Sequence, residues 1–224
     1  MGHLRSHGLN VLLVEYRGYG RSTGTPELGH VLDDVESLPA HVKRLGFELD
    51  KVFVYGRSLG STFAVHYAYT TGVCAGMIID SGMASPYQFL EKRLPLTLEV
   101  LLERKNILAE EVESVKELHE SGALQTLFLA RLNTAVKLQS FQAPLLVLHT
   151  RDDVVLPLEA NGEAIFKAVT RPKGQKTLVV FEGGGHNLIL GFNQADYFRE
   201  VATFLKKCGV KPAVQARASC CSIS

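Results

Sequence analysis

The stretch VFVYGRSLGSTFAVHYAY, residues 52–69, joins an apolar run of strand length to a longer segment of small and apolar residues. We predict a buried strand over residues 51–55 and a helix over residues 59–69. Between them stands GRSLG, residues 56–60, which has the pattern G-x-S-x-G. A strand, a sharp turn and a helix in this order are what a nucleophile elbow requires.

In such an elbow the turn forces Ser58 into a strained backbone conformation and lifts its hydroxyl clear of the sheet. Gly56 and Gly60 are expected to remove side chains that would collide with the neighbouring strand and helix. The hydroxyl would also stand at the N-terminus of a helix, where the helix dipole favours developing negative charge. The alternative is a glycine turn that carries an incidental serine.

The rest of the chain alternates between strand and helix patterns. Further apolar runs of strand length occupy residues 10–16, 75–80, 144–149 and 177–181. Helical spacing of apolar residues predicts helices over residues 26–45, 158–169 and 194–207. Pro39 is expected to bend or divide the first of these. Strands without polar alternation, separated by helices, indicate an α/β protein whose mostly parallel sheet is covered by helices.

One long segment, residues 81–143, interrupts this alternation. It contains three helical patterns, over residues 94–102, 108–118 and 124–132. Because α/β enzymes place caps at the carboxyl ends of strands, we predict a helical cap over about residues 83–142. The alternative is a helical extension that only packs. We therefore expect one domain over residues 1–210 and a flexible tail over residues 211–224.

A serine hydroxyl needs a base, and the base needs an orienting acid. His186 follows the last predicted strand in EGGGHN, where three glycines predict a mobile loop that brings an imidazole to the sheet edge. After the strand at residues 144–149 stand two aspartates, either of which could accept a hydrogen bond from that imidazole. Spacing from the strand end favours Asp153, and Asp152 is the alternative.

Composition excludes several classes of protein. The 24 basic and 23 acidic residues give a formal net charge of +1, which argues against a nucleic-acid-binding protein. No apolar run is long enough to span a bilayer, and residues 1–10 lack the apolar core of a secretory signal. Four cysteines form no disulfide framework and favour a reducing, cytoplasmic location. No pattern implies a metal ion or an organic cofactor.

The sequence resembles the α/β-hydrolase fold superfamily in four segments: Tyr16-Arg17-Gly18-Tyr19-Gly20-Arg21-Ser22, the elbow at residues 56–60, the aspartate loop at residues 149–157, and the Gly-Gly-His segment ending at His186. The resemblance implies that Ser58, Asp153 and His186 are nucleophile, acid and base, with the Leu59 amide in the oxyanion hole. Thr150 departs from the family pattern, which has glycine there. The subgroup that the chain resembles contains cytosolic serine hydrolases, including protein depalmitoylases and membrane-associated esterases.

The same resemblance implies that the N-terminal strands of the family are missing. The predicted strand at residues 10–16 corresponds to the family's fourth, and the loop after its third strand normally supplies a second oxyanion donor. Either Met1 is an internal start, which we favour, or the protein is shortened and catalytically weak. The coding sequence upstream of Met1 would distinguish the two.

Both ends of the chain carry lipidation patterns. Cys221-Ser222-Ile223-Ser224 fits the C-a-a-X pattern for farnesylation, and Cys220 beside it could carry a palmitoyl group. We therefore predict reversible attachment of the C-terminus to the cytosolic face of a membrane, with an unmodified tail as the alternative. Gly2 fits a myristoylation pattern, which has meaning only if Met1 is the true start.

These patterns together predict a serine hydrolase that cleaves a carboxylic ester or thioester through an acyl-serine intermediate. A small-molecule, lipid-like or acyl-protein substrate is expected. Two alternatives stay open: a serine peptidase of the same fold, and a weak or inactive hydrolase remnant that serves as a membrane-tethered interaction module.

Overall fold

The computed structural model describes residues 2–26, 28–93, 109–171 and 175–211. Within them, four parallel strands form one sheet in the order β1 (Phe53–Arg57), β2 (Gly76–Asp80), β3 (Leu145–Thr150) and β4 (Lys176–Phe181). Helices with both ends described are α1 (Gly2–Ser6), α2 (Leu28–Arg44), α3 (Leu59–Thr71), α5 (Ala109–Glu120), α6 (Ala123–Leu132), α7 (Thr134–Leu138), α8 (Gly162–Ala168) and α9 (Gly185–Lys207), with a 3₁₀ turn at Leu49–Lys51. Residues 86–93 are also helical.

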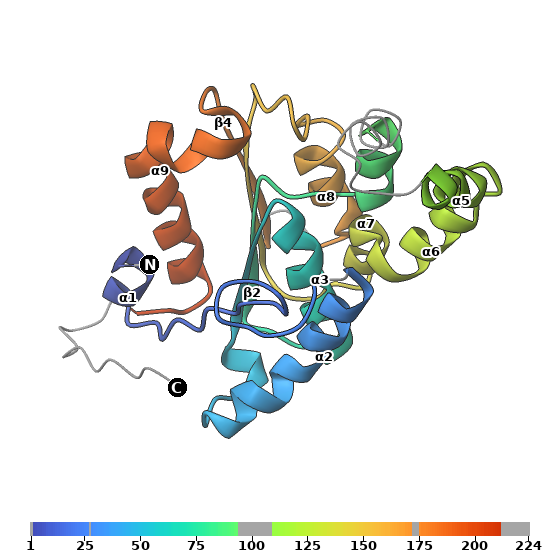
Figure 1. The fold of residues 1–224 in the computed structure, drawn as a ribbon. Coiled ribbons are helices and arrows are strands. Elements are labelled where there is room, and N and C mark those ends of the chain that lie inside the picture. Colours follow the sequence, from blue (N-terminus) through green and yellow to red (C-terminus); the bar gives the residue numbers. More distant parts are fainter. Residues whose placement is uncertain (1, 27, 94–108, 172–174, 212–224) are drawn as a thin grey trace.

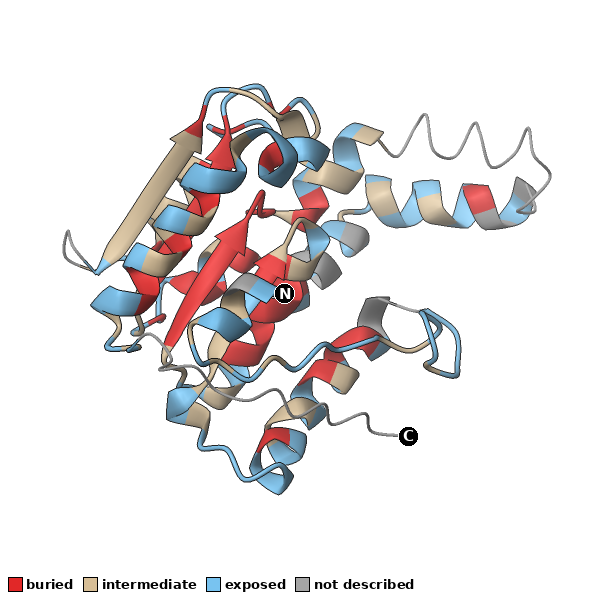
Figure 2. Cartoon of the chain, turned by 90° about the vertical axis from the view of Figure 1, so that its left-hand side faces the viewer, coloured by how far each residue is buried: buried red, intermediate tan, exposed pale blue. Residues whose placement is uncertain are grey.

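Helices cover both faces of the sheet, which confirms the predicted α/β class (Figure 1). On one face, Met77, Ile79 and Val147 pack against α3, α7 and α8. On the other face, Ile78 and Leu148 pack against α9. Every residue of β2 and β3 is buried, as a parallel strand covered on both sides requires (Figure 2).

The predicted strand at residues 10–16 is wrong, because residues 9–16 form no strand. Leu12 and Leu13 are exposed by 49% and 66%. A strand needs a hydrogen-bonded neighbour, and β1, at the end of the described sheet, pairs only with β2. Residues 10–16 therefore stay irregular, because they make no backbone hydrogen-bond ladder with a neighbouring strand in the described part of the chain.

Other boundaries shift by a few residues. The predicted strand at 51–55 begins instead at Phe53, because residues 49–51 form the 3₁₀ turn. Helix α2 is continuous through Pro39, so this proline does not divide it. Helix α9 starts at Gly185, so of the predicted loop only Gly183 and Gly184 precede the helix, and His186 lies inside it. This last difference places His186 in the first turn of a helix.

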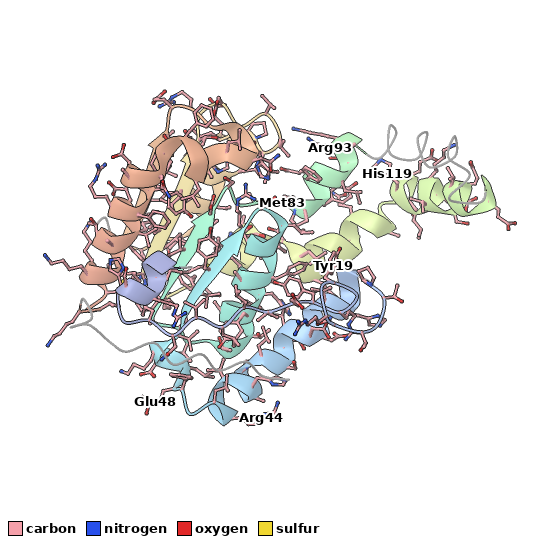
Figure 3. All side chains as sticks on the ribbon, turned by 60° about the vertical axis from the view of Figure 1, so that its left-hand side comes forward. Tyr19, Arg44, Glu48, Met83, Arg93 and His119 are labelled. Atoms are coloured by element: carbon pink, nitrogen blue, oxygen red, sulfur yellow. The ribbon has the colours of Figure 1, made fainter. Side chains whose placement is uncertain are left out.

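The described part of residues 81–143 is largely helical, as predicted. Helices α5 and α6 match two of the three expected helices, whereas the pattern at residues 94–102 lies outside the described residues. Helix α7 was not predicted and packs against α3 and α8. Helix α5 projects away from the sheet, with His119 near its end (Figure 3).

Candidate active site

Ser58 occupies the sharp turn between β1 and α3. Its φ of 52° and ψ of −127° lie in a region that L-residues rarely adopt. A side chain on Gly56 would approach the Cβ of Ala64 and the Cα of Ser61 to 2.6 Å, so glycine is required there. A side chain on Gly60 would meet no atom within 4 Å, so the expected collision at that position is not found.

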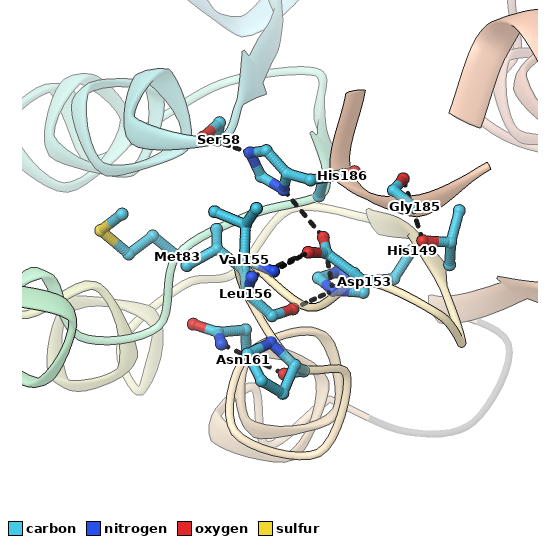
Figure 4. A network of polar contacts seen from close by, with 12 residues as sticks. Ser58, Met83, His149, Asp153, Val155, Leu156, Asn161, Gly185 and His186 are labelled. Atoms are coloured by element: carbon cyan, nitrogen blue, oxygen red, sulfur yellow. Dashed lines mark hydrogen bonds and ion pairs between the residues drawn. The ribbon is translucent and has the colours of Figure 1, made fainter. Parts of the chain in front are cut away.

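A continuous hydrogen-bonded chain connects Ser58, His186 and Asp153 (Figure 4). The Ser58 Oγ lies 2.8 Å from His186 Nε2, and His186 Nδ1 lies 2.8 Å from Asp153 Oδ2. Because an ionised carboxylate only accepts, the imidazole carries its proton on Nδ1 and presents a lone pair on Nε2 to the hydroxyl. The arrangement can accept a proton from Ser58 and stabilise the resulting imidazolium.

Asp153 is held as a carboxylate in a buried position. It is 3% exposed, and its Oδ1 accepts hydrogen bonds from the amides of Val155 at 2.9 Å and Leu156 at 2.8 Å. Burial alone would raise the pKa of Asp153, but the bonds from His186 and the Leu156 amide outweigh it and lower that pKa. The acid is therefore ionised and oriented toward the imidazole.

Asp152 is exposed and has a different set of partners. Its two carboxylate oxygens accept hydrogen bonds from the amides of Gly184 at 3.2 Å and Gly185 at 2.8 Å. The Gly185 amide is the largest cause of the lowered pKa of Asp152. In this geometry Asp152 fixes the backbone before His186 and does not contact the imidazole.

His186 follows β4 and Ser58 follows β1, and these two strands form opposite edges of the described sheet. His186 nevertheless reaches Ser58. With neighbouring strands about 4.8 Å apart, three spacings separate these strands by about 14 Å. The segment before His186 therefore crosses the end of β3, where Thr150 Oγ1 donates to the Gly185 carbonyl at 3.1 Å. Arg57, next to Ser58, donates to the carbonyl of His186 and so links the start of α9 to the end of β1.

A cluster around the buried carboxylate of Asp80, behind the elbow, was missed by the sequence patterns. Asp80, at the end of β2, is 2% exposed and accepts hydrogen bonds of 2.8 Å from the hydroxyls of Tyr55 and Tyr197. Burial and the Asp80 charge raise the pKa of both tyrosines. Arg57 Nε lies 3.8 Å from the same carboxylate, so Asp80 connects α9 to the serine turn. The signal in the sequence that could have indicated this cluster is Asp80, a single acidic residue at the end of an apolar strand.

Leu59 is the first residue of α3, so its amide is one of the groups that have no partner within the helix. It directly follows Ser58, at the positive end of the helix dipole.

Among the described residues, no group of three or more His, Cys, Asp or Glu side chains could hold a metal ion. No described helix is both long and apolar enough to cross a membrane. Cys220 and Cys221 lie outside the described residues.

Comparisons with known proteins agree with this architecture. A model of the alpha/beta hydrolase family matches residues 1–202. The uncharacterized membrane protein YNL320W of Saccharomyces cerevisiae is 28% identical over 185 residues, which are 82% of this chain. The same alignment covers 56% of the yeast protein, so the chain spans little more than half of that relative.

Two solved structures share the fold. An esterase from Pyrococcus furiosus matches 92% of this chain and 72% of its own, with a TM-score of 0.64 at 19% identity. A monoacylglycerol lipase from Paleococcus ferrophilus matches 86% of this chain and 82% of its own, with a TM-score of 0.57 at 19% identity.

Proposed function

Since the chain belongs to the alpha/beta hydrolase family, we propose that it is a serine hydrolase that cleaves a carboxylic ester or thioester. The observation that carries this proposal is the unbroken series of contacts from Ser58 Oγ through His186 to Asp153, both 2.8 Å long. The nucleophile is Ser58, the general base is His186, and the orienting acid is Asp153.

The first half-reaction forms an acyl-serine. His186 Nε2 takes the proton of the Ser58 hydroxyl while Oγ attacks the acyl carbon, and Asp153 stabilises the imidazolium. The imidazolium then gives its proton to the leaving alcohol or thiol. The strained turn holds Oγ within hydrogen-bond reach of His186 Nε2 before attack, at 2.8 Å.

The Leu59 amide is the proposed oxyanion donor. It adjoins the serine and stands at the N-terminus of α3, where a developing negative charge is favoured. Each donor of this kind contributes on the order of 10²–10³ in turnover. In the second half-reaction, His186 activates a water molecule that attacks the acyl-serine and releases the acid.

An acyl or lipid-like substrate is supported by the names of two structural neighbours, an esterase and a monoacylglycerol lipase. The oxygen or sulfur leaving group distinguishes ester from thioester and is settled by assay. Matched p-nitrophenyl and acyl-thiol substrates of equal chain length measure that preference directly.

A fluorophosphonate probe tests the proposed nucleophile on the full chain. We expect the wild type to be labelled and to hydrolyse short p-nitrophenyl esters, and the Ser58→Ala variant to do neither. Ser114→Ala is the matched control, because Ser114 is an exposed serine on α5 whose hydroxyl donates to the carbonyl of Glu110 in its own helix. Labelling that persists in Ser58→Ala contradicts the assignment. A wild type that is neither labelled nor active favours the non-catalytic interaction module.

We also propose that the C-terminus attaches reversibly to a membrane through Cys221, with Cys220 as a second acceptor. The support is the C-a-a-X pattern and the basic residues Lys206, Lys207 and Lys211 before it. Incubation with a farnesyltransferase and labelled farnesyl diphosphate is expected to modify the wild type and Cys208→Ser but not Cys221→Ser. Equal modification of Cys221→Ser contradicts the proposal.

A further inference from the structure

His149 is a second histidine next to the acid, and the proposed mechanism does not use it. It is the penultimate residue of β3 and is 0% exposed. Its Nε2 lies 2.8 Å from the carbonyl oxygen of Leu156 and 3.5 Å from Asp153 Oδ2 (Figure 4). Both neighbouring atoms are acceptors, so His149 carries its proton on Nε2.

The other ring nitrogen of His149 has no hydrogen-bond partner among the described residues. A proton added there would create a buried imidazolium with an unsatisfied N–H group, which is costly. Burial lowers the pKa of His149, against the opposing effect of Asp153. His149 is thus a neutral donor, and it leaves the negative charge of Asp153 available to His186.

The surroundings of His149 are shaped to hold the ring in one orientation. Gly162 begins α8, and a Cβ at this position would approach His149 Cγ and Nδ1 to 2.9 Å. Asn161 donates to the Pro157 carbonyl at 3.1 Å and so fixes the far end of the acid loop. The bond from His149 to Leu156 joins the two ends of the loop at residues 149–157.

We propose that His149 is a positioning residue for the acid, an inference that rests on the proposed function. By holding Leu156, it fixes the loop whose amides orient one oxygen of Asp153. By placing its N–H beside Oδ2, it limits rotation of the carboxylate away from His186. Both effects act on the geometry of the acid, and neither involves contact with substrate.

The test compares His149→Phe, which keeps a planar ring but has no donor, with His149→Gln, which keeps an N–H group. We expect His149→Phe to lower kcat by about 10²-fold with an unchanged KM, the cost typical of a misplacement of about 1 Å. His149→Gln is expected to recover most of that loss. Rates are normalised to the reactive serine concentration from fluorophosphonate titration, so a loss of folded protein does not count as a loss of kcat.

A second pair of variants covers the case in which His149→Phe does not fold. Gly162→Ala pushes on the imidazole from α8 and is expected to lower kcat without altering KM. Gly191→Ala is its control, because a Cβ on Gly191 meets no atom within 4 Å. Equal kcat values for Gly162→Ala and Gly191→Ala overturn the proposal, as does a kcat for folded His149→Phe that equals the wild-type value.

A proton NMR measurement separates this inference from the proposed function. The low-field resonance of the His186 Nδ1–H group reports its bond to Asp153 whether or not the protein turns over an ester. We expect this resonance to shift or disappear in His149→Phe and to return in His149→Gln. An unchanged resonance overturns the positioning role even if Ser58 is the nucleophile, and a shifted one supports it even if the wild type is inactive.

Discussion

Two clusters in this protein place a histidine between a carboxylate and a third polar group. In the candidate active site, His186 connects Asp153 to Ser58 through contacts of 2.8 Å and 2.8 Å. Between α2, α3 and α7, His66 lies 2.8 Å from Glu36 Oε1 and 2.6 Å from Lys137 Nζ. Distances alone do not tell these two arrangements apart.

The third member of each cluster makes the difference. Ser58 stands in a strained turn at the end of a strand, beside the free amide of a helix start. Lys137 is 8% exposed, and its ammonium is committed to His66 and to the carbonyl of Arg131. The carboxylates differ as well, because the side chain of Asp153 is fully buried, whereas that of Glu36 is 46% exposed.

The contrast shows what an acid–histidine pair needs before it can support catalysis. A buried acid keeps the imidazole in one tautomer, and a hydroxyl nucleophile that is not fully buried accepts the substrate. The cluster of Glu36, His66 and Lys137 has neither property, so its role is to hold three helices together. The following variants test this division of roles.

The largest expected effect distinguishes the two carboxylates. In Asp153→Asn an amide that can donate to His186 Nδ1 replaces the carboxylate that accepts from it, which favours the wrong tautomer of the imidazole. This variant is expected to lower kcat by about 10⁴-fold. Glu36→Gln makes the same chemical change in the other cluster and is expected to leave kcat unchanged. Steady-state ester hydrolysis measures both. Equal losses in the two variants would remove the distinction between the clusters.

The next effect is a pH dependence of stability at Lys137. Burial lowers the pKa of Lys137 to about 8, whereas an unfolded lysine titrates near 10.4. Between these values the unfolded chain binds more protons, so this residue makes the free energy of unfolding increase with pH, by about 3 kcal/mol at most.

Lys137→Met is expected to lack this increase from pH 8 to pH 10.4, and urea unfolding of both proteins across that range measures the difference. Parallel curves for wild type and variant would show that Lys137 keeps an ordinary pKa in the folded protein.

A smaller effect is expected for the neighbour of the acid. Asp152→Asn weakens the bonds to the amides of Gly184 and Gly185, and we expect kcat to fall about tenfold because His186 is less well placed. The exposed position of Asp152 limits the loss. If Asp152→Asn costs more activity than Asp153→Asn, the assignment of the acid is reversed.

The smallest effect concerns two threonine hydroxyls that bond carbonyls near the two histidines. Thr150 Oγ1 donates to Gly185, and Thr70 Oγ1 donates to His66 at 2.9 Å. Loss of either bond is expected to cost about 1 kcal/mol of the free energy of unfolding. Only Thr150→Val is expected to lower kcat as well, by a few-fold. A matching loss of kcat in Thr70→Val would indicate a general effect of stability.

Much of the site could be predicted because its signals are local. The elbow needs only a strand, a glycine that avoids a collision with Ala64, and a serine, all within a few residues. The strands β2 and β3 are apolar throughout, as burial on both faces requires. The network of Tyr55, Asp80 and Tyr197 was missed, since it joins residues that are far apart in the chain.

The amino-acid sequence by itself determined the α/β class, the strand–turn–helix around Ser58 and the order of serine, aspartate and histidine along the chain. Only the tertiary structure decided which of two adjacent aspartates meets the imidazole, that His186 begins a helix, and that residues 10–16 form no strand. The reason is that these outcomes depend on hydrogen-bond partners supplied by distant segments. A local pattern states what a segment can form, and its neighbours in space select what it does form.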